Sequence, residues 1–161
     1  MRRTVEILFV CTGNTCRSPL AEVIAARRLE VGAASVQARS AGTDAWDGEP
    51  PSVLAQQVAA EVGLDLTAHR ARRVTPEMLA GAALVLAMAP AHVDALRRLS
   101  PAAASRVHLL RDYAEGVGKG AAVIDPIGGD LGAYRRTLQE LQALVEASVE
   151  RFLAEATSRE A

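Results

Sequence analysis

The sequence predicts an α/β fold of three layers, in which helices cover both faces of a four-stranded parallel sheet. Short apolar runs that suit buried strands alternate along the chain with longer helical stretches. Half of the residues are hydrophobic but only 3% are aromatic, a composition that favours a helix-rich aliphatic core. Because 161 residues is the length of one ordinary domain, we expect residues 1–161 to form a single domain.

The first half of the chain is expected to alternate two strands with two helices. The apolar run Val5–Val10 predicts a buried strand, and a polar turn separates it from an Ala- and Leu-rich helix at Pro19–Glu30. A second strand is expected at Val36–Ser40. The loop AGTDAWDGEPP follows, and Ser52 then caps a helix that extends to about Val62.

The second half continues this alternation and ends in a long helix. The run ALVLAM, Ala83–Met88, predicts a third strand, Pro90–Leu99 a helix and Val107–Leu110 a fourth strand. The segment Arg111–Gly132 holds six of the twelve glycines, so we expect it to be loop-like. Apolar residues recur at helical spacing through Tyr134–Ala156, which predicts an amphipathic helix packed on the core.

Charge and hydropathy exclude two classes of partner. A formal net charge of −1 provides no field that would attract nucleic acid or a membrane surface. The first apolar run is short and interrupted by Glu6, unlike a secretion signal, and the longest apolar window, near residues 80–91, is too short to cross a bilayer. Two cysteines indicate a reduced cytoplasmic protein rather than a disulfide-stabilised one.

The segment Cys11–Ser18 follows the first strand directly and combines residues that suit an oxyanion site. In parallel sheets, ligands bind beyond the carboxyl ends of the strands. Gly13 and Asn14 tolerate backbone conformations that let successive amides converge on an anion, and Arg17 adds a planar bidentate cation. The same surroundings favour a thiolate at Cys11. This loop is therefore suited to bind a phosphoryl group and to attack it.

Other roles for Cys11 must be weighed against this interpretation. A packed core cysteine would also fit well after a buried strand. The spacing to Cys16 is not that of a C-x-x-C redox motif, and no second cysteine pair exists for a zinc site. The three histidines also lack ligand spacing: His69, His92 and His108. The anion-binding interpretation explains four neighbouring residues together: Gly13, Asn14, Arg17 and Ser18.

The octamer CTGNTCRS after ILFV, with Asp125 and Pro126 downstream, resembles the low-molecular-weight protein tyrosine phosphatases and their bacterial relatives, the protein arginine phosphatases. The resemblance covers nearly the whole chain, including SAGT at Ser40–Thr43 and LVLAM at Leu84–Met88. It implies a flavodoxin-like strand order and a hydrolase that removes phosphate from phosphorylated proteins. No metal or organic cofactor is implied, inorganic phosphate is the product, and we expect a monomer.

The resemblance also implies a role for each matching residue. Cys11 would attack phosphorus and form a phosphocysteine, Arg17 would hold the phosphoryl oxygens, and Asp125 would act as general acid and then base. Phosphate or substrate binding would fall to Thr12, Gly13, Asn14, Thr15, Cys16, Ser18 and Trp46.

Supporting roles follow in the same way. The Ser18 hydroxyl would stabilise the thiolate, and Trp46 would form an aromatic wall at the pocket entrance. A polar network would hold the loop in shape through Asn14, Ser40 and His69. Cys16 could pair with Cys11 under oxidation, and we treat reversible inhibition by that disulfide as a hypothesis.

Two departures from the tyrosine-directed pattern favour phosphoarginine as substrate. Thr15 stands where tyrosine-directed members commonly carry Ile or Leu, and its hydroxyl offers a partner to the N–H groups of phosphoarginine. The residues after the Asp-Pro pair are Ile127, Gly128 and Gly129 rather than aromatic. Phosphotyrosine remains the alternative, because Trp46 could stack on its ring. An arsenate reductase would need further cysteines, and a non-catalytic binding module would lack the nucleophile or the acid.

Overall fold

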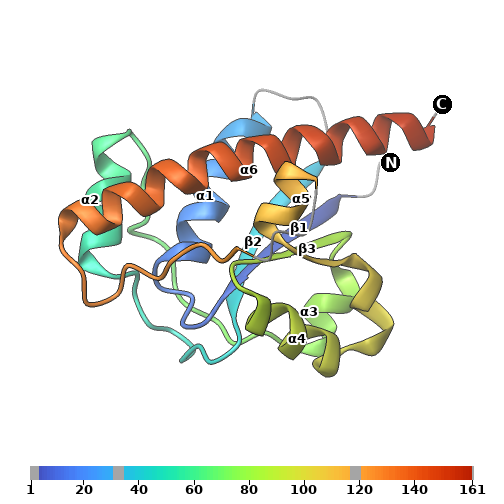
Figure 1. Ribbon diagram of the computed structural model, residues 1–161, viewed down its shortest axis with the longest axis horizontal. Coiled ribbons are helices and arrows are strands. Elements are labelled where there is room, and N and C mark those ends of the chain that lie inside the picture. The colour runs from blue at the N-terminus through green and yellow to red at the C-terminus, as the bar shows by residue number, and fades with distance from the viewer. Residues whose placement is uncertain (1–3, 31–34, 117–120, 161) are drawn as a thin grey trace.

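Four parallel strands form the centre of the computed structural model, which describes residues 4–30, 35–116 and 121–160 (Figure 1). They are β1 (Val5–Cys11), β2 (Val36–Gly42), β3 (Leu84–Ala87) and β4 (Val107–Leu109). Their order in the sheet is β2-β1-β3-β4, and every neighbouring pair is parallel. This arrangement confirms the predicted parallel sheet and its flavodoxin-like order.

Helices cover both faces of the sheet, which confirms the three-layer prediction. One face carries α1 (Arg17–Glu30), α2 (Val53–Glu61), α5 (Leu110–Glu115) and α6 (Leu131–Glu160). The other carries α3 (Pro76–Gly81), α4 (Pro90–Leu99) and the 3-10 helix η1 (Pro101–Arg106). In Figure 1 the long helix α6 crosses over α1 and α5, against which it packs.

The continuous apolar run of β1 follows from its central place in this sandwich. Ile7 and Phe9 are buried in the cluster beneath α1 and α6, whereas Leu8 and Val10 are buried in the cluster beneath α3 and α4. Successive strand residues point to opposite faces, so a strand covered on both faces needs apolar residues at every position.

Two helices and one 3-10 helix were not predicted. Helix α3 begins with a recognisable signal, because the Thr75 hydroxyl accepts from the Met78 amide and Pro76 occupies the first turn. Helix α5 begins at the last residue of the expected fourth strand and otherwise lies in the segment expected to be a loop. It has no side-chain cap at its start and ends at Glu115, and its buried residues Leu110 and Tyr113 belong to the core shared with α6. Tertiary packing rather than a local signal stabilises α5.

Several boundaries also differ from the prediction. Helix α1 begins two residues earlier and α6 three residues earlier than expected, and α6 ends at Glu160. Strand β2 extends to Gly42, and β4 ends one residue earlier, at Leu109. Residues 117–120 of the expected loop lie outside the described residues. No helix in the described part of the chain has the length and apolar character needed to cross a bilayer.

The carboxyl ends of β1 and β2 lie side by side, with Cys11 paired to Gly42. A Cβ atom at Gly42 would come within 2.4 Å of the carbonyl oxygen of Thr12. Only glycine therefore allows the end of β2 to approach the loop that follows Cys11 this closely. This contact sets the position of the loop between β1 and α1.

Candidate active site

Residues 12–16 form a loop that is tied to the surrounding structure through backbone carbonyl groups, together with the carbonyl of Cys11 at the end of β1. The pairs are Thr43 N with Cys11 O, Asp44 N with Thr12 O and Ser52 N with Thr15 O, each at 2.9 Å. In the described part of the chain no acceptor binds the amide hydrogens from Thr12 to Ser18. The loop therefore presents a row of free N–H donors at the start of α1, which is the geometry of an anion nest.

Asn14 holds this loop in shape from inside the protein. Its φ angle is 55°, the single positive value at a non-glycine residue within the described ranges, and its side chain is fully buried. The side-chain amide donates to Ser18 Oγ at 2.8 Å, and Oδ1 accepts from the Arg72 backbone amide at 3.0 Å. The Asn14 carbonyl lies 2.8 Å from His69 Nε2, so this nitrogen of His69 is the donor.

Cys11 is buried at the end of β1 with its Sγ atom 2.9 Å from Ser18 Oγ. Because Asn14 already donates to this oxygen, the single hydroxyl proton of Ser18 is free to point elsewhere. Its two candidate acceptors are Cys11 Sγ and, at 3.3 Å, the carbonyl of Ala41. The nearer one is the sulfur. A hydroxyl donor and the positive end of α1 therefore both face Cys11 Sγ.

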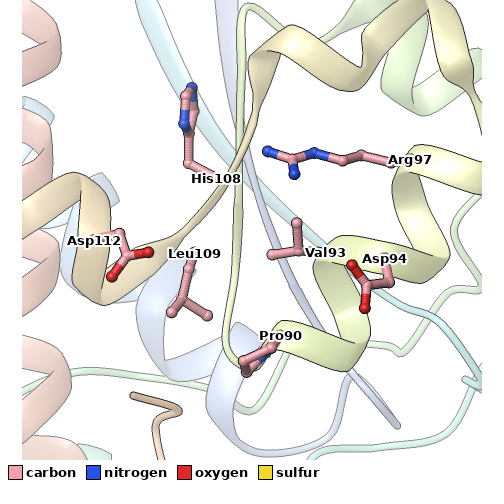
Figure 2. A pocket seen from close by; sticks show the side chains of 7 residues that line it. All are labelled: Pro90, Val93, Asp94, Arg97, His108, Leu109 and Asp112. Carbon is pink, nitrogen blue, oxygen red and sulfur yellow. The ribbon is translucent and has the colours of Figure 1, made fainter. Parts of the chain in front are cut away.

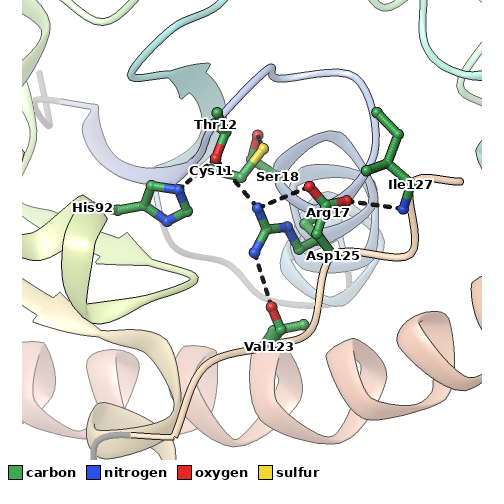
Figure 3. Close-up of polar contacts among 8 residues, drawn as sticks. All are labelled: Cys11, Thr12, Arg17, Ser18, His92, Val123, Asp125 and Ile127. Carbon is green, nitrogen blue, oxygen red and sulfur yellow. Dashed lines mark hydrogen bonds and ion pairs between the residues drawn. The ribbon is translucent and has the colours of Figure 1, made fainter.

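Arg17 and Asp125 meet beside Cys11 although they are far apart in sequence (Figure 3). Arg17 is only 5% exposed; its Nη1 donates to the Val123 carbonyl at 2.9 Å, and its Nη2 lies 3.4 Å from Asp125 Oδ2. The other Asp125 oxygen accepts from the Ile127 amide at 3.1 Å. A buried cation with one long contact to a partly exposed carboxylate is only partly neutralised, so the site is electrostatically suited to an anion.

These side chains surround a cavity of about 140 Å³. It is lined by Cys11, Thr12, Gly13, Thr15, Cys16, Arg17, Ser52, Asp125, Ile127 and Tyr134. The structure thus brings together most of the residues predicted to bind phosphate. Asn14 and Ser18 lie behind the cavity wall. Tyr134 and Ser52 were not predicted as lining residues, because nothing in their local sequence points to this site.

Cys16 lies beside Cys11 in the cavity wall, and both thiols are free and buried. Burial, followed by the neighbouring Cys11, raises the pKa of the Cys16 thiol well above its ordinary value. Cys16 is therefore a thiol at neutral pH, which limits its reactivity in disulfide exchange. The Cys11 to Cys16 disulfide remains a prediction.

Ser40 reaches the loop only indirectly. Its hydroxyl donates to Glu22, and its carbonyl accepts from Arg72 Nε at 2.9 Å. The backbone amide of Arg72 in turn donates to Asn14, whose carbonyl accepts from His69. Trp46 is 79% exposed and lines a separate hollow with Asp44, Ala45 and Arg73. Within the described residues, Trp46 is not among the side chains that line the cavity around Cys11, and its role as an aromatic wall at the pocket entrance remains a prediction.

His92 is a site residue that the sequence interpretation missed. It comes from the first turn of α4, and its Nε2 atom lies 2.8 Å from Thr12 Oγ1 (Figure 3). Burial, and then the charge of Arg17, lower the pKa of His92 to about 4, so the ring is neutral at neutral pH. No sequence signal links residues separated by 80 positions.

A second and larger cavity, of about 200 Å³, lies between α4, β4 and α5 (Figure 2). It is lined by Pro90, Val93, Asp94, Arg97, His108, Leu109 and Asp112. It has no nucleophile comparable to Cys11, and its arginine already donates to the carbonyl of Val107. The described residues also contain no group of three or more His, Cys, Asp and Glu side chains that could hold a metal ion. The chemistry of the site thus centres on Cys11.

Comparison with known proteins agrees with this geometry. The family model described as "Low molecular weight phosphotyrosine protein phosphatase" matches residues 6–159. A protein-arginine-phosphatase of Geobacillus stearothermophilus is 36% identical over 150 residues, which cover 93% of this chain and 97% of the relative. A low molecular weight protein-tyrosine-phosphatase of Streptomyces coelicolor is 38% identical over 146 residues, which cover 87% and 88%.

One similar solved structure contains a phosphorylated active-site residue. It is the YwlE arginine phosphatase in a mutant form with a phosphorylated active-site serine. It superposes with a TM-score of 0.86 at 32% identity, over 91% of this chain and 95% of that one.

Proposed function

Since the chain belongs to the low molecular weight phosphotyrosine protein phosphatase family and is a cysteine-based protein phosphatase, we propose that its substrate is phosphoarginine in proteins. The reaction is hydrolysis through a phosphocysteine at Cys11. Its first support is the juxtaposition of Cys11, the nest of free amides and the buried guanidinium of Arg17.

In the first step the Cys11 thiolate attacks phosphorus, and the bond between phosphorus and the guanidino nitrogen breaks. Asp125 donates a proton to the departing nitrogen, so arginine leaves with its nitrogen protonated. The phosphoryl group remains on sulfur as phosphocysteine. Asp125 reaches the site at the cavity mouth, where its side chain is 39% exposed and so can meet the leaving group.

In the second step water attacks the phosphocysteine, and Asp125 takes the proton from that water. The sulfur leaves as a thiolate, which the Ser18 hydroxyl stabilises across 2.9 Å, and inorganic phosphate is released. In both steps the loop amides and Arg17 bind the equatorial oxygens. Most of the catalysis is therefore positioning and charge stabilisation.

Thr15 is the observation that carries the choice of substrate. Its side chain lines the cavity beside Cys16, and its hydroxyl has no hydrogen-bond partner among the described residues. That hydroxyl can accept from a guanidino N–H of phosphoarginine, whereas the ring of phosphotyrosine offers it no donor. Trp46 is exposed and does not line this cavity among the described residues, which weakens the argument for a stacked tyrosine ring.

Phosphotyrosine is the second candidate because of Tyr134. This buried aromatic residue lines the cavity and could contact a substrate ring. The two substrates can be separated by steady-state kinetics on peptides of one sequence that carry either phosphoarginine or phosphotyrosine. We expect the higher kcat/KM on phosphoarginine. A wild type that strongly prefers the phosphotyrosine peptide would overturn the proposal.

The same assay on variants tests whether Thr15 determines the choice. Thr15→Ile removes the hydroxyl and should shift the kcat/KM ratio toward phosphotyrosine by about tenfold or more. Thr15→Ser is the matched control, because it keeps the hydroxyl and should keep the ratio. Turnover of an aryl phosphate that disappears in Cys11→Ser distinguishes an enzyme from a phosphate-binding module.

We further propose that residues 1–161 act as one domain, as a monomer and in the cytoplasm. One continuous sheet with an apolar cluster on each face supports the first point, and two free cysteines agree with a reducing compartment. Light scattering during gel filtration measures the oligomeric state. A stable dimer at micromolar concentration would contradict the monomer.

A further inference from the structure

His92 contacts a residue of the site, but the proposed mechanism gives His92 no role. The residue is 6% exposed, and its Nε2 atom lies 2.8 Å from the hydroxyl oxygen of Thr12, a cavity-lining residue. The same oxygen lies 3.4 Å from Arg17 Nη2 (Figure 3). Thr12 Oγ1 is therefore placed between a neutral imidazole and the guanidinium that binds phosphoryl oxygens.

The surroundings of the imidazole decide which of its nitrogens carries the proton. His92 Nδ1 is buried and has no hydrogen-bond partner within the described residues. A buried N–H without an acceptor is rarer and more costly than a buried lone pair without a donor. The proton is thus assigned to Nε2, which donates it to Thr12 Oγ1.

This assignment fixes the direction of the Thr12 hydroxyl. The oxygen accepts from His92 and from Arg17, and these two donors occupy both of its lone pairs. Its own proton must then point away from both donors, and the side chain borders the cavity. Directed into the cavity, this hydroxyl donor would join the loop amides around the space where the phosphoryl oxygens bind.

We propose that His92 is a positioning residue, which acts through Thr12 by turning the Thr12 hydroxyl proton toward a phosphoryl oxygen of the substrate. The inference rests on the proposed function, because it assumes that the cavity binds a phosphoryl group. It adds a side-chain donor and its orienting partner to the nest. The donor contacts oxygens that carry charge throughout the reaction, so it contributes mainly to binding and less to the chemical step.

The test measures inorganic phosphate binding by calorimetry and aryl phosphate turnover in parallel. We expect His92→Phe and Thr12→Val each to weaken phosphate binding by about tenfold, as for one hydrogen bond to a charged group. KM should rise by a similar factor while kcat changes less. His92→Gln, whose amide can place a donor near the position of Nε2, should recover most of the loss.

A double variant distinguishes positioning from a merely structural role. If His92 acts through Thr12, His92→Phe combined with Thr12→Val binds phosphate no more weakly than Thr12→Val alone. Losses that multiply would overturn the inference, as would unchanged phosphate affinity in either single variant. His108→Phe is the matched control, since His108 is a half-buried histidine in the second cavity and away from the site.

Failure of the proposed function and failure of the positioning role of His92 give different results. Thr12 is exposed, so Thr12→Val tests the donor even if His92→Phe does not fold. In one outcome the wild type binds phosphate, with the variants weakening binding as expected, and yet does not hydrolyse the aryl ester. That result would contradict the proposed function and support this inference. Wild type that hydrolyses the ester with equal phosphate affinity in all variants would overturn this inference alone.

Discussion

The neutral state of His92 has a measurable effect on stability below neutral pH. The folded protein lowers the pKa of His92 from 6.5 to about 4, through burial and the charge of Arg17. As the pH falls below 6.5 the unfolded chain binds a proton at this histidine, whereas the folded protein binds it only near pH 4. The free energy of unfolding must therefore decrease across this interval.

The size of the effect follows from the two pKa values. The difference between them corresponds to a loss of about 3 kcal/mol in the free energy of unfolding when the pH is well below both values. Between pH 7 and pH 4.5 the histidine should account for a loss of about 2 kcal/mol, since the folded protein has by then bound part of its own proton. The facing charged groups Asp125 and Asp44 raise this pKa and limit the effect.

His92→Gln isolates this contribution, because glutamine does not titrate and keeps a donor near Thr12. Urea unfolding at pH 7 and pH 4.5 gives the free energy of unfolding of both proteins. Wild type should lose about 2 kcal/mol more than the variant between the two pH values. Equal losses of unfolding free energy in the wild type and the variant would show that His92 is protonated equally easily in the folded and unfolded states. The assignment of a neutral buried ring would then be wrong.

Three further predictions concern other parts of the site. Asp125→Asn should lower kcat by about 10²- to 10⁴-fold on substrates with poor leaving groups and less on aryl phosphates with good ones, measured over a leaving-group series. Gly42→Ala should lower the free energy of unfolding by about 1 to 3 kcal/mol in urea titrations, because its Cβ would meet the Thr12 carbonyl. Peroxide inactivation should be reversed by a thiol reductant in wild type but not in Cys16→Ser; irreversible loss in wild type would contradict a protective disulfide.

The phosphate loop could be predicted because its signals are contiguous. A buried strand, a glycine, an asparagine that tolerates positive φ, an arginine and a helix start all occur within Val5–Ser18. These residues need only their own backbone to come together. The prediction of Cys11, Arg17 and the amides as neighbours therefore needed little information from the rest of the chain.

The surrounding structure could not be predicted in this way. Arg72 contacts Asn14 through its backbone amide, so no property of its side chain marks this contact in the sequence. His92 reaches Thr12 because α4 packs on the face of the sheet that adjoins the loop, a matter of tertiary geometry. Ser40 was assigned by resemblance, but its hydroxyl binds Glu22 instead. Side-chain direction depends on neighbours that a linear pattern does not reveal.

The loop is held by bonds to its backbone carbonyls, so the groups that shape the site differ from the side chains that could select its substrate. Thr43 and Asp44 anchor the loop through backbone amides alone, so their side chains are free of this task. New side chains there would alter the surface beside the loop, including the hollow that Asp44 shares with Trp46, while the anion nest keeps its shape. The same nest could thus be retained while mutation beside it adapts the enzyme to a different phosphorylated protein, which makes this surface a natural place to begin redesign.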